Sequence, residues 1–216
     1  FLTLNIPIGI FLTMKIKDPN KAKRTRQFII EKSAPIFNKK GIAGTSLSDL
    51  TEATGLTKGS IYGNFKDKDE VAVCVFQYNV DNLTGYLNSA MDKEETNTDK
   101  LLAIPKAYRK LYKTMIEYGG CPILNTGAEA DDTHQTLCRM TADAIEMLKK
   151  NILKLVESGK QTGEFHSCLD AGKIANITMA LIEGGSILSK ITGKDTYMMN
   201  SLEQIENLIH SSVLSN

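Results

Sequence analysis

The stretch of sequence that decides the fold is GIAGTSLSDLTEATGLTKGSIYGNFKDKDEVA, residues 41–72. Its first part predicts a short helix over 47–54, because apolar residues recur there at helical spacing. The apolar side of this helix consists of Leu47, Leu50 and Ala53. Ser46 is a favourable N-cap, and the aspartate three residues later is typical of a capping box. Gly55 is expected to end the helix.

A second short helix is predicted over 58–64, with Thr57 as its N-cap. Ile61 and Phe65 lie four residues apart and are expected to face inward. The small and polar residues between them remain on the outer side, as in a helix-turn-helix, whose second helix enters the major groove of DNA. The lysines at both ends suit phosphate contacts. The stretch therefore predicts DNA binding, and the alternative is an ordinary helical hairpin with solvated charges.

Longer helices are predicted on both sides of this stretch. One covers 20–40 and ends at Gly41, and Pro35 within it removes a backbone donor and predicts a kink. A long helix begins after Lys66, with Asp67 near its start, and runs to about Met91. The polar residues 92–99 predict a loop. Further helices are predicted over 100–118, from 122 to 130, over 133–158, over 170–191 and over 197–213.

Charge is unevenly distributed along the 216 residues, whose formal net charge is +1. Residues 14–68 hold 12 Lys and Arg against 5 Asp and Glu, whereas residues 69–216 hold 14 against 20. A basic head on an acidic body is expected when only the head contacts DNA phosphates. The alternative is a solvated basic helix.

The first 13 residues, FLTLNIPIGIFLT, are apolar and carry no charge. They are too short to span a bilayer, and they lack the basic region and cleavage site of a signal peptide. We interpret 1–13 as upstream sequence or part of something longer, with Met14 as the natural start. The alternative interpretation of 1–13 is a membrane anchor. For the rest of the chain no membrane partner is expected.

The residues from the first helix to the start of the long one resemble the TetR (tetracycline-repressor, TetR/AcrR) family. The matching features are Phe37, Gly41, Thr45, Ser46, Leu50, Ala53, Gly55, Leu56, Lys58, Gly59, Ser60, Ile61, Tyr62, Phe65, Lys68 and Asp69. The resemblance is strong and ungapped over 24–72, and beyond that it rests on length and the helical body. The chain departs from the family at 63 and 64, where tyrosine and histidine are common.

The resemblance implies an all-α fold. An N-terminal three-helix helix-turn-helix domain, 14–66, would be joined by a long helix to a helical ligand-binding and dimerisation domain, 67–216. It also implies a cytoplasmic transcriptional regulator, by family habit a repressor. Such a protein binds double-stranded palindromic operator DNA as a homodimer and is released by a small-molecule inducer.

Carried over residue by residue, the resemblance implies a set of DNA contacts. These residues are Ser46, Ser48, Lys58, Gly59, Ser60, Tyr62, Asn64 and Lys68. Lys58 and Ser60 would read base edges, and Gly59 would let the backbone approach DNA closely because it has no side chain. Tyr62 and Lys68 match residues that contact phosphate, with the amide of Lys68 helped by its position at a helix N-terminus.

In this family the body holds the ligand pocket, and its last two long helices form the dimer interface. The candidate pocket residues are Tyr108, Met115, Tyr118, Cys121, Asn125, Glu129 and Met147. The candidate interface residues are Ile174, Ile177, Thr178, Leu181, Ile182, Gly185 and Leu188, a stripe that suits close helix contact. The alternative for both sets is ordinary core within one chain.

The segment GGCPILNTGAE, residues 119–129, is the most distinctive part of the body. Pro122 can begin a helix whose N-terminus lies against Cys121, and a thiol in that position can have a lowered pKa. Two hypotheses follow for Cys121: a redox or electrophile sensor, or a buried structural cysteine. The sequence shows no nucleophile–base array, phosphate loop or metal cluster, so neither catalysis nor a metal or other cofactor is predicted. The four scattered cysteines are expected to be free thiols.

Overall fold

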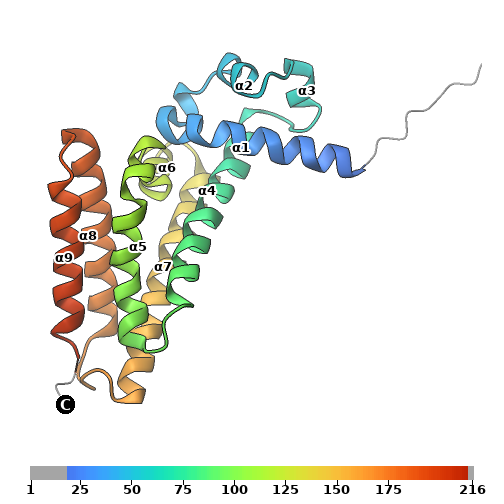
Figure 1. The fold of residues 1–216 in the computed structure, drawn as a ribbon. Coiled ribbons are helices and arrows are strands. Elements are labelled where there is room, and N and C mark those ends of the chain that lie inside the picture. Colours follow the sequence, from blue (N-terminus) through green and yellow to red (C-terminus); the bar gives the residue numbers. More distant parts are fainter. Residues whose placement is uncertain (1–18, 214–216) are drawn as a thin grey trace, which may run out of the picture.

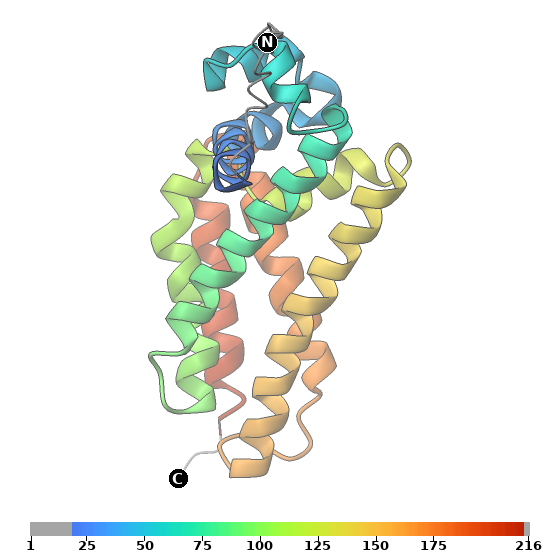
Figure 2. The same cartoon turned by 90° about the vertical axis from the view of Figure 1, so that its right-hand side faces the viewer.

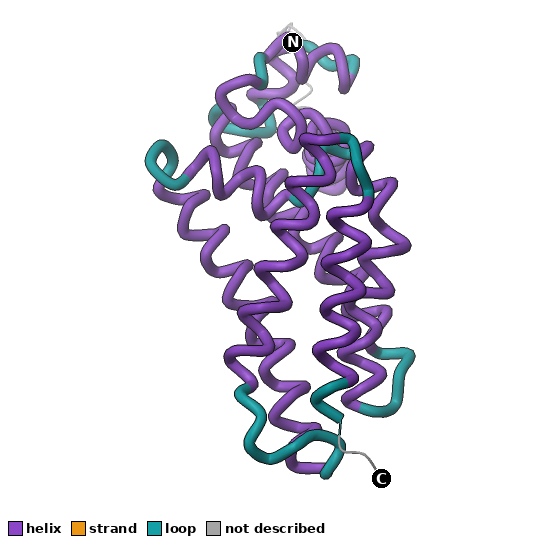
Figure 3. The backbone as a smooth tube through the Cα atoms, turned by 90° about the vertical axis from the view of Figure 1, so that its left-hand side faces the viewer, coloured by secondary structure: helices purple, strands orange, loops and turns teal. Residues whose placement is uncertain are grey.

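The computed structural model describes residues 19–213, and the leader 1–13 lies outside this range. Its helices are α1 Pro19–Gly44, α2 Leu47–Thr54, α3 Lys58–Tyr62, α4 Lys68–Met91, α5 Asn97–Glu117, α6 Pro122–Ala130, α7 Gln135–Thr162, α8 Ala171–Thr192 and α9 Thr196–His210. Within 19–213 there is no strand, apart from one isolated bridge between Phe165 and Val213 (Figure 3). The predicted all-α class is confirmed.

The helices form a small head on a long bundle (Figure 1). Helices α1, α2 and α3 make the head, and α4 descends from it into the bundle of α5 to α9. Viewed from the side, α1 is seen end-on, above α4 and beside the top of α5 (Figure 2). The junction between head and bundle is therefore built from α1, α4, α5 and α6.

Local sequence signals account for the short helices of the head. Ser46 caps α2 through a capping box with Asp49, in which each side chain accepts a hydrogen bond from the other residue's amide. Gly55 ends α2 with a φ of 67°, in the left-handed region. Thr57 caps α3 by accepting a hydrogen bond from the amide of Ser60. The predicted caps are confirmed, and α3 ends two residues before the predicted position.

The break in α1 lies at Gly41 and not at Pro35. Gly41 has φ 70° and ψ −176°, which is non-helical, and the helix resumes for one short turn after it. Proline removes one backbone donor but has a φ compatible with a helix, whereas this combination of dihedral angles is open essentially to glycine alone. The kink predicted at Pro35 was therefore placed six residues too early.

The apolar core of the protein extends into the head, where it sets the orientation of α3. The side chains of Ile29, Leu50 and Ile61 are fully buried, and Phe65 is nearly so. Burial of one such side chain contributes about 1.5–3 kcal/mol. Because α3 is anchored through Ile61, its remaining residues face away from the protein.

Helix α5 begins three residues earlier than predicted, because its N-terminus is capped twice. Thr96 accepts a hydrogen bond from the amide of Asp99. Glu164, in the turn after α7, accepts hydrogen bonds from the amides of Asn97 and Thr98 at 3.2 and 2.8 Å. A carboxylate from a distant part of the chain thus satisfies amides that the first turn of a helix leaves unpaired.

This cap predicts a pH dependence of stability. Burial alone would raise the pKa of Glu164, but the hydrogen bonds from Thr98 and Asn97 outweigh it and lower the pKa to about 2. A lowered folded-state pKa stabilises the fold above the ordinary value of 4.5 and loses that effect as the pH falls toward 2. We expect Glu164→Gln to flatten the decline of the melting temperature in this window. Glu203→Gln, on the exposed side of α9, is the control, and parallel curves for parent and Glu164→Gln would contradict the assignment.

Helix α8 is long and apolar enough, by length and composition, to cross a membrane. In the structure its buried side packs against α7 and α9. The apolar side chains of α8 therefore contribute to the core of the bundle.

Candidate nucleic-acid interface and effector region

Helix α3 presents a polar outer surface at the far end of the head. Lys58, Gly59 and Tyr62 are exposed, and Ser60 is half-buried. Asn64, just beyond the helix, donates a hydrogen bond from its side chain to the carbonyl of Ser60 at 2.8 Å. The amide group of Asn64 therefore holds the end of this turn.

The two serines predicted at the start of α2 differ in their surroundings. The hydroxyl of Ser46 is engaged in the capping box, where it also donates to the carboxylate of Asp49 at 2.9 Å. Ser48 lies on the exposed first turn, one residue into the helix. Of these two side chains, Ser48 is the more accessible for contact with DNA.

The ammonium group of Lys68 forms hydrogen bonds within the protein, which the sequence did not indicate. Its Nζ donates hydrogen bonds to the carbonyls of Ile42 and Thr45 at 2.7 and 3.0 Å. One of its three donors remains for a phosphate. Its amide stands at the first residue of α4, where a helix has no acceptor of its own for it.

Arg26 was missed by the sequence analysis, yet it ties α3 to the rest of the head. Its guanidinium donates to the carbonyl of Asn64 and to Glu70 Oε1 at 2.6 Å. It also lies over the ring of Phe65, 4.0 Å from the centroid. Basic side chains are common in the first helix of such domains, so only tertiary structure distinguishes this one as an internal clamp.

Glu129, a predicted pocket residue, bonds α6 to the broken end of α1. Its two carboxylate oxygens accept hydrogen bonds from the amides of Ile42 and Ala43, each at 2.8 Å. A β-carbon at position 41 would overlap this carboxylate, so glycine is required there on two grounds. We call the contact of Glu129 with Gly41, Ile42 and Ala43 the α1–α6 latch.

Asn125, another predicted pocket residue, lies at the same junction. Its side chain donates to the carbonyl of Asn38 in α1 at 3.1 Å and to that of Gly119 at 2.8 Å, and it accepts a hydrogen bond from Lys190 at 3.2 Å. Asn38 in turn donates to the carbonyl of Tyr118 at 2.7 Å. The turn after α5 and the first part of α6 are thus bonded to the head.

Cys121 is buried, with 2 % of its surface exposed, and its Sγ donates to Glu183 Oε1 at 3.2 Å. Burial, followed by the nearby carboxylate of Glu183, raises the pKa of this thiol well above its ordinary value. The prediction of a lowered pKa was wrong, because burial and a neighbouring acid outweigh the two amides at the start of α6. The structural interpretation of Cys121 replaces the sensor hypothesis.

The seven predicted pocket residues do not share one cavity. Met115 and Tyr118 line a cavity of about 390 Å³ between α1, α4 and α5, here called the junction cavity. Asn125 and Glu129 line a second one of about 330 Å³ beside α6. Tyr108 faces a space of only about 20 Å³ inside the bundle. Met147 lies on the outer side of α7 with 39 % of its surface exposed and lines none of these three cavities, so its place in a ligand site stays a prediction.

The predicted interface stripe on α8 is divided between two sides of the helix. Four of its residues are buried within the subunit and are therefore less suited to contact a partner: Ile174, Thr178, Ile182 and Gly185. Gly185, for example, faces α9, where a β-carbon would lie 2.7 Å from Ser201 Oγ. Ile177, Leu181 and Leu188 lie on the neighbouring side with Ile191, which is 73 % exposed. We call the surface of Ile177, Leu181, Leu188 and Ile191 the outer α8 face.

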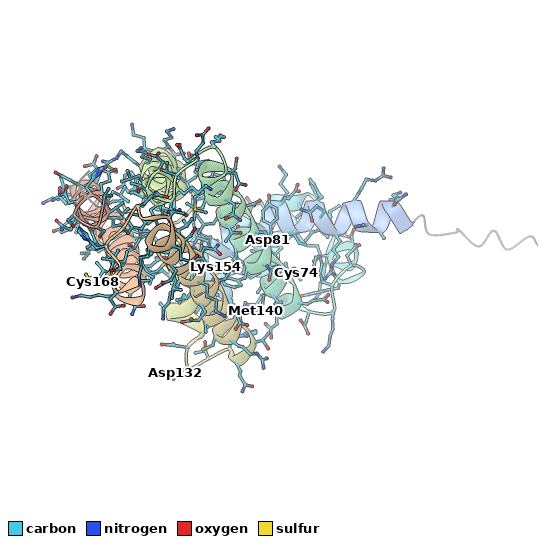
Figure 4. The ribbon with its side chains drawn as sticks, turned by 90° about the horizontal axis from the view of Figure 1, so that it is seen from below. Cys74, Asp81, Asp132, Met140, Lys154 and Cys168 are labelled. Atoms are coloured by element: carbon cyan, nitrogen blue, oxygen red, sulfur yellow. The ribbon has the colours of Figure 1, made fainter. Side chains whose placement is uncertain are left out.

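The cysteines of the described chain are all free thiols. From below, Cys74 on α4 and Cys168 before α8 lie on opposite sides of the bundle (Figure 4). Among residues 19–213, no three His, Cys, Asp or Glu side chains are grouped so that they could hold a metal ion.

A helix-turn-helix head joined by one long helix to an all-helical bundle defines the class of the molecule as a DNA-binding regulator. Residues 29–73 match the family model described as bacterial regulatory proteins, tetR family, and 97–205 match the tetracyclin repressor-like C-terminal domain. The chain belongs to the TetR family of transcriptional regulators.

Two proteins of known structure and one curated relative agree with this assignment. A TetR-family transcriptional regulator from Cytophaga hutchinsonii is 43 % identical, covering 91 % of this chain and 98 % of that chain, with a TM-score of 0.86. A TetR transcriptional regulator from Chloroflexus aurantiacus is 31 % identical, covering 90 % and 98 %, with a TM-score of 0.85. The transcriptional repressor DhaR of Mycobacterium sp. (strain GP1) is 24 % identical over 166 residues, 77 % of this chain and 82 % of DhaR.

Proposed function

We propose that the protein is a ligand-responsive transcriptional repressor that binds a palindromic operator as a homodimer. The observation that carries the proposal is α3, a short helix anchored by Ile61 whose Lys58 and Tyr62 point away from the protein. Such a helix suits the major groove, and the flanking basic residues suit phosphates. DhaR is named a transcriptional repressor, which supports repression as the mode of regulation. A regulator of this kind would act in the cytoplasm, where operator DNA lies.

We divide the chain into a DNA-binding domain, 14–66, and a ligand-binding and dimerisation domain, 67–216. The end of α3 at Tyr62 and the start of α4 at Lys68 support this division. The outer α8 face would meet its copy in the partner, together with the exposed Tyr197 at the start of α9. Two isologous faces of this kind make a four-helix contact.

Induction would act through the junction between the domains. DNA fixes the spacing of the two recognition helices at about 34–36 Å, one helical turn, so a small change of that spacing disfavours binding. In this chain the α1–α6 latch and the bonds of Asn38 connect the head to α6 and to the turn after α5. A ligand that displaces either segment would move α1 and with it α3. The coupling would be reciprocal, so operator DNA would weaken ligand binding by the same factor.

The first test uses Lys58→Ala and a palindromic duplex selected from a random pool. If Lys58 reads a base edge, we expect a loss of about 1–3 kcal/mol in binding to the selected duplex and a smaller loss with a scrambled one. Fluorescence anisotropy at several salt concentrations measures both. Lys93→Ala is the matched control, because Lys93 is an exposed lysine that follows the C-terminal end of α4. If the selection enriches no palindromic duplex, this result counts against the proposed function. If Lys58→Ala weakens binding to both duplexes equally, this result counts against the proposed role of Lys58.

A further inference from the structure

The junction cavity is lined by α1 of the head and by α4 and α5 of the body. Figure 1 shows α4 on one side of α5, with α8 and α9 on the other. Its volume of about 390 Å³ is within the range of small-molecule sites. It is distinct from the interior of the bundle, where the space beside Tyr108 is about 20 Å³. An occupant of the junction cavity would touch both the head, through α1, and the body, through α4 and α5.

The side chains around the junction cavity share a chemical character. Three tyrosines, Tyr78, Tyr86 and Tyr118, contribute ring surface, and Met115 adds a polarisable thioether. Tyr118 is 55 % exposed, so its ring is accessible before any ligand arrives. The only charged side chain in the lining is the carboxylate of Glu31, whereas the cavity beside α6 is lined by three lysines. Ring faces and a carboxylate both attract cations.

Pro35 adds an acceptor to the same wall. Proline has no N–H, so it cannot donate the helical hydrogen bond to the carbonyl of Glu31, four residues earlier in α1. Glu31 and Pro35 both line the junction cavity. The carbonyl of Glu31 thus lacks its usual helical donor. The anionic group of the α1 wall is the carboxylate of Glu31, whose Oε1 also accepts a hydrogen bond from Gln27 at 2.8 Å. Pro35 therefore affects the wall of this cavity, although it is not needed to form α1 or the DNA interface.

We propose that the junction cavity binds an apolar organic cation, with the cationic centre between Glu31 and the tyrosine rings. The proposal deepens the proposed function, on which it rests, by naming the class of effector and the place where it acts. Asn38, on the same wall, donates to the carbonyls of Tyr118 and Gly120 at 2.7 and 3.0 Å. A cation that enters beside these bonds loosens the attachment of α1 to the turn after α5 and weakens operator binding.

The binding test compares two ions of nearly equal size and shape but opposite charge, tetraphenylphosphonium and tetraphenylborate. Calorimetric titration of the full chain is expected to show one phosphonium ion per subunit, bound at least about tenfold more tightly than the borate. Glu31→Gln is expected to weaken phosphonium binding about 5–10-fold, whereas Glu203→Gln leaves it unchanged. Tyr118→Leu is expected to weaken it similarly, and Tyr118→Phe retains it because the ring face is kept.

Several results would overturn the proposal. Borate binding as tightly as phosphonium, or Glu31→Gln with the affinity of the parent, would remove the cation site. Because Glu31 and Tyr118 are both exposed, their variants are expected to fold, which thermal melting checks. Phosphonium that binds in this cavity yet leaves operator affinity unchanged would overturn its effector role. If the protein without phosphonium binds no selected palindrome, the proposed function is overturned instead. The calorimetric comparison of phosphonium with borate would still measure the charge preference of the cavity.

Discussion

Replacement of both Leu188 and Ile191 by glutamate is expected to convert the proposed homodimer into a folded monomer. Operator affinity should then fall by about 10²–10⁴-fold, because each subunit loses the effective concentration that its partner supplies. The two side chains are 46 % and 73 % exposed in the subunit, so the charges do not disturb its core. In a two-fold interface they would place four carboxylates against apolar surface and against one another.

Sedimentation equilibrium at micromolar concentration measures this effect, with operator anisotropy alongside it. Met147→Glu provides the matched control, since it also places a carboxylate on an exposed apolar position, here on α7. The control is expected to stay dimeric with normal operator affinity. A double variant that still sediments as a dimer would show that the outer α8 face is not the interface.

Gly41→Ala is expected to destabilise the protein by about 3–6 kcal/mol. A non-glycine residue at φ 70° and ψ −176° costs about 1–3 kcal/mol in backbone strain. The new β-carbon would also displace the carboxylate of Glu129 from the amides of Ile42 and Ala43. Hydrogen bonds to a charged group are worth about 1.5–3 kcal/mol each, and part of this is lost.

Thermal and urea unfolding measure the effect, and Gly85→Ala is its matched control. Gly85 lies within α4 with open space around it, so alanine there should stabilise the helix by up to about 1 kcal/mol. Glu129→Gln separates the two contributions, because it weakens the α1–α6 latch without straining the backbone. If Gly41→Ala and the parent protein have the same free energy of unfolding, neither the dihedral angles at Gly41 nor the α1–α6 latch constrains this junction.

The head could be predicted from the sequence in detail because its signals are local. Ser46, Gly55 and Thr57 act on amides and carbonyls within four residues, so their roles follow from spacing alone. The spacing of Ile61 and Phe65 likewise indicated which side of α3 is buried. The family resemblance then rested on these same residues.

The effector region could be predicted only in part, because its contacts join residues far apart in the chain. Tyr118 was predicted as a pocket residue and does line a cavity, but α1 supplies another wall of that cavity through Glu31 and Pro35. Nothing in the segment 119–129 indicates that Glu129 accepts hydrogen bonds from residues 42 and 43. A carboxylate at helical spacing looks the same whether it faces solvent, a ligand or another helix.

Sequence by itself determined the all-helical class, the capped helices of the head and the outward surface of α3, since each depends on hydrogen bonds and periodicity within a few residues. Tertiary structure alone decided that Cys121 is a buried thiol beside Glu183, that Lys68 bonds to the end of α1, and which side of α8 stays exposed. The physical reason is that pKa, hydrogen-bond partner and burial depend on groups brought near by packing, and a single chain position does not specify its distant neighbours.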